Sequence, residues 1–296
     1  MPKPKKPSIF DGLDENIDSF FGINETWNYQ GDPIDYADKA SLIQLCSGFG
    51  EQNVNCRDLI DTLFAQVNST WDSLAPNDFD GHHSPHNWRR EKNRYLADHN
   101  RSDEVTLERI ITRVTDYNWW NQIPVEQTLL GVRKGKVIDL VHRDGTEGKD
   151  FEIIELKTGG GYTPLSATGQ VLKYGIVYAF YRSRYEKLFN ERPAAELLKS
   201  SQITLVVLAP WAFYREFENC GWLSRLEVSL NNALYDFSAA NADTLPMMGF
   251  KFQTFPKDFV WSAENAWDDE AKKWRIGAQK EALWAVHHRE AVFGNN

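Results

Sequence analysis

The clearest pattern of apolar and polar positions begins at residue 102. Apolar side chains recur there with helical spacing at Leu107, Ile110, Ile111 and Val114, directly after Ser102 and Asp103. The serine and the aspartate are residues that commonly cap the start of a helix. The pattern predicts a helix of about four turns.

Three apolar runs follow this helix, each bounded by glycine or by a charged turn. They predict strands over residues 122–130, 135–142 and 151–158. Residues 164–185 return to helical spacing, and the almost wholly apolar run 203–209 predicts a strand that is buried on both faces. This order of helix, three strands, helix and strand predicts a fold of the α/β (α+β) class with a mixed central sheet flanked by helices.

The regions on either side of this core are less regular. Residues 59–64 have helical spacing, and the turn-forming residues of 75–85 predict a boundary. Beyond the core we expect a helix over 223–234, a strand over 248–255 and a Trp-rich helical stretch over 264–292. The expected segments are a disordered basic tail (1–7), a helical N-terminal region (8–85), the core (86–210) and a C-terminal extension packed on the core (211–296).

Composition limits the class of protein. The 296 residues are 42% apolar and 25% charged, as in ordinary soluble proteins. No run approaches the roughly 18 consecutive apolar residues of a membrane helix, and the N-terminus lacks the apolar stretch of a secretory signal. The three cysteines are too few and too scattered for a disulfide framework or a zinc ribbon. We therefore expect a cytoplasmic protein with no membrane association.

The net charge of −9 opposes indiscriminate binding to nucleic acid, because lysine and arginine supply most of that affinity. A protein that acts on nucleic acid would therefore need a local basic surface. Two groups of cations could form one, and each could equally be a solvated helix face. The first group is Arg89, Arg90, Lys92, Arg94, Arg101, Arg109 and Arg113, and the second is Arg182, Arg184 and Lys187.

The segment between the second and third predicted strands has the composition of a hairpin loop centred on Glu147. A hairpin symmetric about that residue places Asp139 opposite Glu155, with Cβ atoms about 5 Å apart on one face of the sheet. Lys157 lies two residues beyond Glu155 and shares this face. The sequence therefore predicts a cluster of two carboxylates and one ammonium.

Two opposed carboxylates among Val, Ile and Leu repel each other and lose hydration, at a cost of several kcal/mol. A hard divalent cation would offset this repulsion, because Mg²⁺ binds one or two carboxylates and keeps water and phosphate oxygens as its other ligands. Such an ion activates water and stabilises a phosphate under attack, and a nearby ammonium assists. Asp139, Glu155 and Lys157 are together suited to phosphodiester hydrolysis.

The residues around this cluster resemble the signature of the PD-(D/E)XK nuclease superfamily. The motif comprises Val137-Ile138-Asp139-Leu140 and Ile153-Ile154-Glu155-Leu156-Lys157. Lys157-Thr158-Gly159 and Gln170-Val171-Leu172-Lys173-Tyr174 further resemble the KTG and QxxxY segments of RecB-type members. The resemblance spans residues 102–210 and implies a restriction-endonuclease-like core.

The resemblance also implies roles for individual residues. Asp139 and Glu155 would bind Mg²⁺ or Mn²⁺ together with the carbonyl of Leu156, and Lys157 would be the catalytic lysine. Gln170, with Tyr174, would support the site or contact the substrate.

Family members often add a glutamate from the first helix, and Glu104 and Glu108 are the two candidates. On a helical wheel Glu104 lies roughly 70° from the centre of the apolar face and Glu108 roughly 110° away. We therefore select Glu104 as the additional metal ligand. The alternative is that Glu104 only complements the helix dipole in the first turn.

Other motifs compete less well. His82, His83 and His86, with His99, could bind Zn²⁺, but no cysteine or acidic partner lies at an established spacing. Residues 159–161 are three glycines without the Lys-Ser/Thr of a P-loop, so a flexible turn is the better interpretation.

The leading hypothesis is a Mg²⁺- or Mn²⁺-dependent deoxyribonuclease that acts in defence against foreign DNA or in DNA repair and processing. The alternatives are an RNase that uses the same site and a catalytically silent nuclease fold that serves as a binding module in a larger complex. The expected partner is DNA, with a protein partner or self-association left open. Trp119, Trp120, Tyr162 and Tyr174 could stack on bases, although we expect most tryptophans to lie in the core.

Overall fold

A computed structural model describes the parts of the chain that carry the main elements. The described residues are 8–23, 55–74, 88, 102–115, 118–125, 136–144, 148–159, 163–184, 196–215, 217, 221–268, 270–271 and 273–293. The basic tail, the 75–85 boundary, the histidine cluster and Tyr162 lie outside them, as do most of the first group of cations and Lys187.

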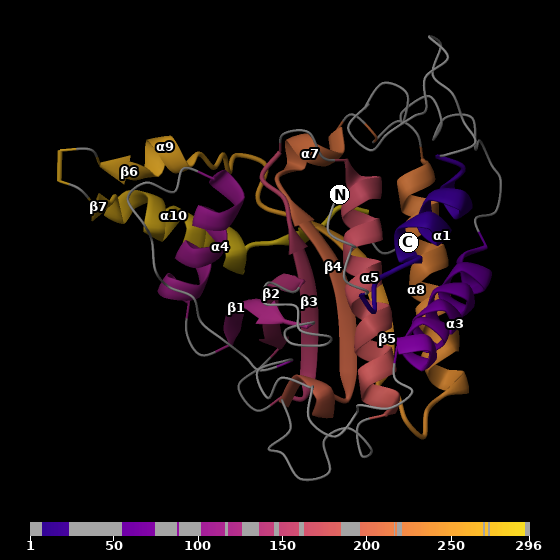
Figure 1. Cartoon of the computed structure of the whole chain (residues 1–296). Coiled ribbons are helices and arrows are strands. Elements are labelled where there is room, and N and C mark those ends of the chain that lie inside the picture. Colours follow the sequence, from indigo (N-terminus) through magenta and orange to yellow (C-terminus); the bar gives the residue numbers. More distant parts are fainter. Residues whose placement is uncertain are drawn as a thin grey trace, which may run out of the picture.

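A mixed six-stranded sheet forms the centre of the molecule, with strand order β1-β2-β3-β4-β5-β8 (Figure 1). β2 is antiparallel to both of its neighbours, β1 and β3. The strands β3, β4 and β5 are parallel, and β8 is antiparallel to β5. Their bounds are β1 Trp119–Pro124, β2 Val137–Asp144, β3 Asp150–Leu156, β4 Gln202–Ala209, β5 Met247–Thr254 and β8 Glu290–Ala291. The predicted α+β class with a mixed sheet is confirmed.

Helices lie on both sides of this sheet (Figure 1). One side carries α4 (Asp103–Val114), α9 (Ala263–Ala266) and α10 (Ile276–His287). The other side carries α1 (Leu13–Phe21), α3 (Cys56–Leu74), α5 (Pro164–Ser183) and α8 (Trp222–Ala240). The short helices η2 (Glu196–Lys199) and α7 (Trp211–Arg215) flank β4 along the chain.

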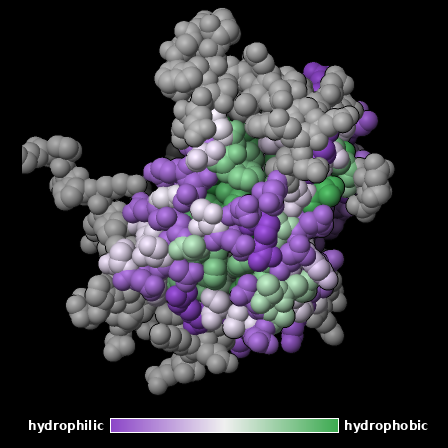
Figure 2. Space-filling view, turned by 90° about the vertical axis from the view of Figure 1, so that its right-hand side faces the viewer, coloured by the Kyte–Doolittle hydropathy of each residue, from purple (hydrophilic) through white to green (hydrophobic). Residues whose placement is uncertain are grey.

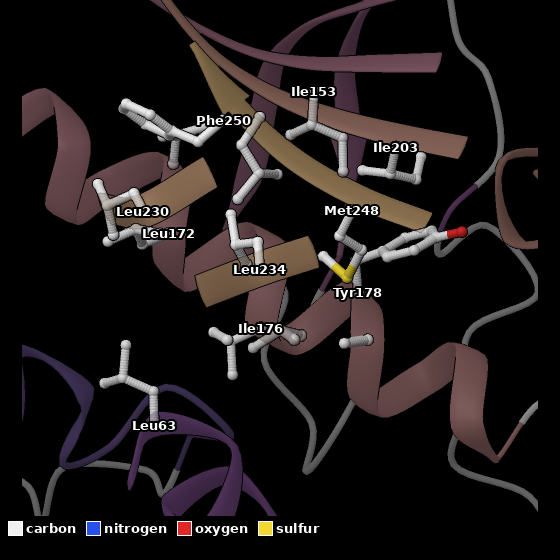
Figure 3. Close-up of a cluster of buried hydrophobic side chains, with 14 of the residues drawn as sticks. Leu63, Ile153, Leu172, Ile176, Tyr178, Ile203, Leu230, Leu234, Met248 and Phe250 are labelled. Atoms are coloured by element: carbon white, nitrogen blue, oxygen red, sulfur yellow. The ribbon is translucent and has the colours of Figure 1, made fainter. Parts of the chain in front are cut away.

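Two apolar layers pack against the two faces of the sheet. Ile153 of β3 belongs to the layer shared with α1, α3, α5 and α8, and Figure 3 shows it with labelled side chains from α3, α5 and α8. Ile154 and Leu156 belong to the opposite layer, shared with α4, α9 and α10. The face that carries Ile153 is therefore the α5 face, and the face that carries Ile154 is the α4 face.

Local sequence explains why α5 begins where it does. Thr163 and Ser166 form a capping box around Pro164, which occupies the first turn, where its missing amide is harmless. Near its middle, α5 approaches β4 very closely: a Cβ at Gly175 would lie 2.4 Å from Cδ1 of Leu205. Gly175 therefore fixes how deeply α5 seats on the sheet.

Most predicted elements are confirmed with shifted bounds. The first strand was expected over 122–130 but covers Trp119–Pro124, and residues 126–130 lie outside the described chain. The cap at Ser102 is present, with its hydroxyl accepting from the amide of Val105. Residues 211–296 also contribute β5 and β8 to the central sheet.

The expectation of one helical stretch over 264–292 is wrong. It divides into α9, a hairpin of β6 (Trp267–Asp268) and β7 (Lys273–Trp274), α10 and β8. Oδ1 of Asp268 accepts from the amide of Ala271 and so closes a turn, while Trp267 packs edge-on against Trp274 with ring centroids 5.1 Å apart. Tryptophan spacing here arises from cross-strand pairing and not from a helix face.

The side of the molecule formed by α8, α3 and α1 has a surface of hydrophilic side chains interrupted by apolar areas (Figure 2). Val228 and Tyr235 of α8 are among the exposed large apolar residues. In the described part of the chain, no helix combines the length and hydropathy needed to cross a membrane.

The close approach of α5 to β4 predicts the effect of Gly175→Ala. The added methyl group must displace the fully buried Leu205, so we expect a loss of about 1–3 kcal/mol in the free energy of unfolding. Chemical denaturation measures this change, and Gly175→Ala with Leu205→Val should recover part of it. Gly277→Ala in α10 is the matched control, because its Cβ would meet nothing within 4 Å. Equal effects at the two glycines would contradict the packing account.

Candidate active site

A buried lysine joins two elements at the end of β3. The ammonium of Lys157 donates to Oε1 of Glu155 at 2.6 Å and to Oε1 of Glu104 at 3.2 Å. The side chains of Lys157 and Glu155 are only 2% and 5% exposed, whereas that of Glu104 is 27% exposed, so the cluster meets water on the Glu104 side. Residues from α4 and from the end of β3 thus meet although they are about fifty positions apart in the sequence.

Asp139 lies where the predicted register places it. The β2–β3 pairing runs from Asp144 with Asp150 to Leu140 with Ile154, so the next position of the same register sets Asp139 opposite Glu155. The regular pairing stops there. The amide of Leu156 instead donates to Oδ2 of Asp139 at 3.1 Å, and the carboxylate thereby replaces a backbone acceptor of β2.

The alternating direction of backbone hydrogen bonds along β3 orients Leu156. The amide of Lys157 bonds the carbonyl of Leu208 in β4, so the neighbouring residue, Leu156, directs its own amide and carbonyl towards β2. Past Lys157 the β4 partner is Pro210, which has no amide hydrogen to continue the ladder. The Leu156 carbonyl therefore points to the side of the strand where Asp139 lies.

The β1–β2 ladder is also interrupted at Asp139. Pairs form on both sides of this position, Asn121 with Leu140 and Ile123 with Ile138, but Gln122 and Asp139 between them do not pair. Gln122 has a φ of 53°, in the left-handed region that a residue with a side chain seldom adopts. Such strain is maintained only where the surrounding structure fixes it, and it is concentrated at functional sites.

The carboxyl groups outnumber the cations here, and their pKa values reflect this. Burial, followed by the charge of Glu155, raises the pKa of Asp139 well above its usual range. Burial also raises the pKa of Glu155, although Lys157 opposes the effect. For Lys157 burial acts to lower the pKa, but Glu155, Asp139 and Glu104 outweigh it and the net pKa is raised. The cluster thus holds a charged lysine, and Asp139 and Glu155 keep their protons to a higher pH than isolated carboxyl groups do.

Glu108 is a further buried carboxyl group beside the site, and the helical wheel did not identify it. Its Oε1 accepts from the amide of Asn121 at 2.7 Å and its Oε2 from the amide of Gln122 at 2.8 Å. Only 1% of the residue is exposed, and burial raises its pKa to about 8. The wheel failed because α4 packs against both the sheet and α10, so its buried arc is wider than the apolar side chains alone indicate.

The donor set fits a divalent cation with a limited number of protein ligands. No three His, Cys, Asp or Glu side chains of the described residues converge closely enough to hold a metal by themselves. Asp139 and Glu155 with the Leu156 carbonyl provide oxygen ligands only, as Mg²⁺ and Mn²⁺ prefer, and Mg²⁺ characteristically keeps several waters. Glu104, the additional ligand expected from the sequence, bonds Lys157 instead.

Gln170, Lys173 and Tyr174 share one face of α5, because they are three and four residues apart. Oε1 of Gln170 is buried and finds no hydrogen-bond partner among the described residues. Tyr174 packs edge-on against Phe10 with ring centroids 6.0 Å apart. Gln170 and Tyr174 thus lie on the helix face that also carries Lys173.

The aromatic and basic candidates divide between the core and the surface. Trp119 and Trp120 are buried, as expected for most tryptophans, and are therefore closed to stacking on bases. Arg184 lies over the ring of Phe180 and bonds Asn68. Arg113, in the last turn of α4, is exposed.

A second charged cluster lies on the α4 face, three residues along each strand from the first. Glu152 accepts from Arg289 at 2.9 Å and contacts His142 at 2.8 Å and Lys251 at 2.5 Å. Burial acts to raise the pKa of Glu152, but these partners outweigh it and the net pKa is lowered. The sequence signal for this cluster is the presence of His142 and Glu152 next to apolar residues of their strands. This cluster ties the segment before β8 to the sheet, with Arg289 and Lys251 sharing the carboxylate of Glu152.

The raised pKa of Glu108 predicts a pH dependence of stability. The unfolded carboxyl ionises near 4.5 and the folded one near 8, so the unfolded chain loses its proton first as the pH rises. The free energy of unfolding should therefore fall between these values, with a slope approaching about 1.4 kcal/mol per pH unit for one proton, and be unaffected by this group above them. Glu108→Gln, which mimics the protonated acid, should flatten this component in denaturation measured with EDTA. An unchanged slope in the variant would contradict the assignment.

Comparison with known proteins adds no relationship. No family model, no curated protein and no solved structure matches the chain. The site is therefore defined by its own geometry: a buried ion cluster of Glu104, Asp139, Glu155 and Lys157 at a break in the sheet.

Proposed function

We propose that this protein is a metal-dependent nuclease with a PD-(D/E)XK-type site that hydrolyses phosphodiester bonds in DNA. The observation that carries the proposal is the buried cluster in which Lys157 bonds Glu155 at 2.6 Å while Asp139 occupies the opposing position of the register. These residues form the motif that the sequence resembles, and they meet around one point. A restriction-endonuclease-like core is part of the same proposal.

The arrangement of charges favours catalysis over a purely structural role. A structural ion pair needs one carboxylate for each ammonium, as surplus buried charge is destabilising. Here Glu104, Glu155 and Asp139 all act on Lys157, and burial raises the pKa of both Asp139 and Glu155. A fold under no functional constraint gains nothing from that excess.

Each residue would have a defined task. Asp139, Glu155 and the Leu156 carbonyl would hold Mg²⁺ or Mn²⁺, which when bound supplies an acidified water and polarises the phosphate. Lys157 would stabilise negative charge that develops on the phosphate oxygens, held in position by Glu104 and Glu155. Water is largely excluded around Lys157, so its charge acts strongly over short distances.

The substrate class is the less constrained part of the proposal. The ion cluster acts on the phosphodiester, which DNA and RNA share, so the same residues would serve an RNase. Defence against foreign DNA and DNA repair or processing both need this chemistry. The alternative of a silent binding module predicts no hydrolysis of either polymer.

The test is cleavage of linear, circular and single-stranded DNA, and of RNA, with Mg²⁺, Mn²⁺ or EDTA. We expect metal-dependent cutting by the wild type and a loss of roughly 10²–10³-fold or more in Lys157→Ala. Lys199→Ala, which removes an exposed lysine of η2, is the matched control for net charge and should cut normally.

A second variant separates catalysis from folding. Lys157→Ala leaves buried carboxylates without their cation and can unfold the chain. Lys157→Met with Glu155→Gln removes the pair together, so it should keep a cooperative thermal transition and still fail to cut. Full cutting by this folded double variant, or no cutting of any substrate by the wild type, would overturn the proposal.

A further inference from the structure

Lys173 of α5 lies near the candidate site but is not part of its ion cluster. It is the central polar residue of the face that also carries Gln170 and Tyr174. Glu155 is two residues beyond Ile153 and so shares the face of β3 against which α5 packs. The close packing of Gly175 against Leu205 fixes α5, the helix that carries Lys173, on the sheet. The position of this cation relative to β3 is therefore set by rigid elements.

The partner of Lys173 is unusual for a cation in this position. Its ammonium pairs with Oδ1 of Asp14 in the first turn of α1. The lysine side chain is 14% exposed, whereas the side chain of Asp14 is 65% exposed. An exposed carboxylate is well hydrated and screened by salt, so it holds its partner weakly. A more highly charged anion could displace it.

The backbone that presents Asp14 is held firmly. The side chains of Leu13, Ile17 and Phe21 anchor α1 in the core. Gln66 and Thr70 of α3 both donate to the carbonyl of Asp11 just before the helix. The Asp14–Lys173 pair can therefore open by side-chain rotation alone, without moving α1.

We propose that Lys173 binds a backbone phosphate of the nucleic-acid substrate, next to the phosphate that is cleaved. In the free protein the carboxylate of Asp14 pairs with Lys173 in place of this phosphate. The inference rests on the proposed function, which supplies the phosphate ligand. It is favoured by the excess of acidic side chains around the cluster, since a polyanion approaching Asp139 and Glu155 needs a cation nearby. One turn earlier, the buried oxygen of Gln170 has no hydrogen-bond partner among the described residues, so this face of α5 offers a polar group to a ligand or water.

Removing either member of the pair breaks the same ion pair but should have opposite effects on binding. The probe is a short fluorescein-labelled single-stranded oligodeoxynucleotide, with anisotropy measured in Ca²⁺ so that turnover does not contribute. Lys173→Met should weaken binding roughly tenfold and reduce the salt dependence by about 0.7 in the slope of log K against log salt. Asp14→Asn should tighten binding up to about fivefold, because the competing carboxylate is gone.

Matched controls separate this mechanism from a general change in charge. Glu15→Gln alters the same turn of α1 by the same charge, and its side chain is exposed. It should change binding much less than Asp14→Asn does. Lys199→Met plays the same role for Lys173→Met.

The double variant gives the decisive comparison. If Asp14 acts only through Lys173, Asp14→Asn should have no effect in the Lys173→Met background. An equal effect of Asp14→Asn in both backgrounds, or wild-type affinity in Lys173→Met, would overturn the inference. The proposed function fails separately, when wild-type protein cuts no substrate; cutting with unaltered binding by Lys173→Met rejects only the role of Lys173.

Discussion

The site depends on one interaction, the burial of the Lys157 ammonium among carboxyl groups at the end of β3. A buried ammonium is stable only with close anionic partners, and Glu155 and Glu104 supply them at 2.6 and 3.2 Å. This requirement links α4 to the sheet and fixes where Leu107, Ile110 and Ile111 pack. The same cluster carries more acid than the lysine neutralises, so it stays poised for another cation.

The regular hydrogen bonding of the sheet is interrupted beside this cluster, at Asp139. The β1–β2 pairing skips Gln122 and Asp139, and the Asp139 carboxylate takes the Leu156 amide that β2 backbone would otherwise accept. The left-handed conformation of Gln122 lets its side chain reach Glu108. A carboxylate that bonds backbone is held in one orientation.

Periodicity and spacing predicted much of this architecture. The symmetric hairpin about Glu147 gave the register that pairs Leu140 with Ile154, and helical spacing located α4 and α5. These inferences depend on local patterns, because side chains alternate between the two faces of a strand and recur every three to four residues on one face of a helix. The prediction of a single helix over 264–292 was wrong, because the spacing of tryptophans does not distinguish a helix face from a cross-strand pair.

Tertiary contacts were beyond the sequence. Glu108 is buried where α4 docks on β1, with Asn121 and Gln122 of that strand bonding its carboxyl group. The pairing of Lys173 with Asp14 likewise joins α5 to α1, and these two residues are 159 positions apart in the sequence. Neither contact has a periodic signature, and each depends on how finished elements dock.

The most direct test of the account is calorimetric titration of the protein with Mn²⁺ in two buffers of different ionisation enthalpy. Because the pKa of Asp139 and that of Glu155 are both raised, the account predicts binding accompanied by proton release, and loss of both in Asp139→Asn. Lys157→Met should still bind the ion. Absence of Mn²⁺ binding by the wild type at millimolar concentration would contradict the central claim.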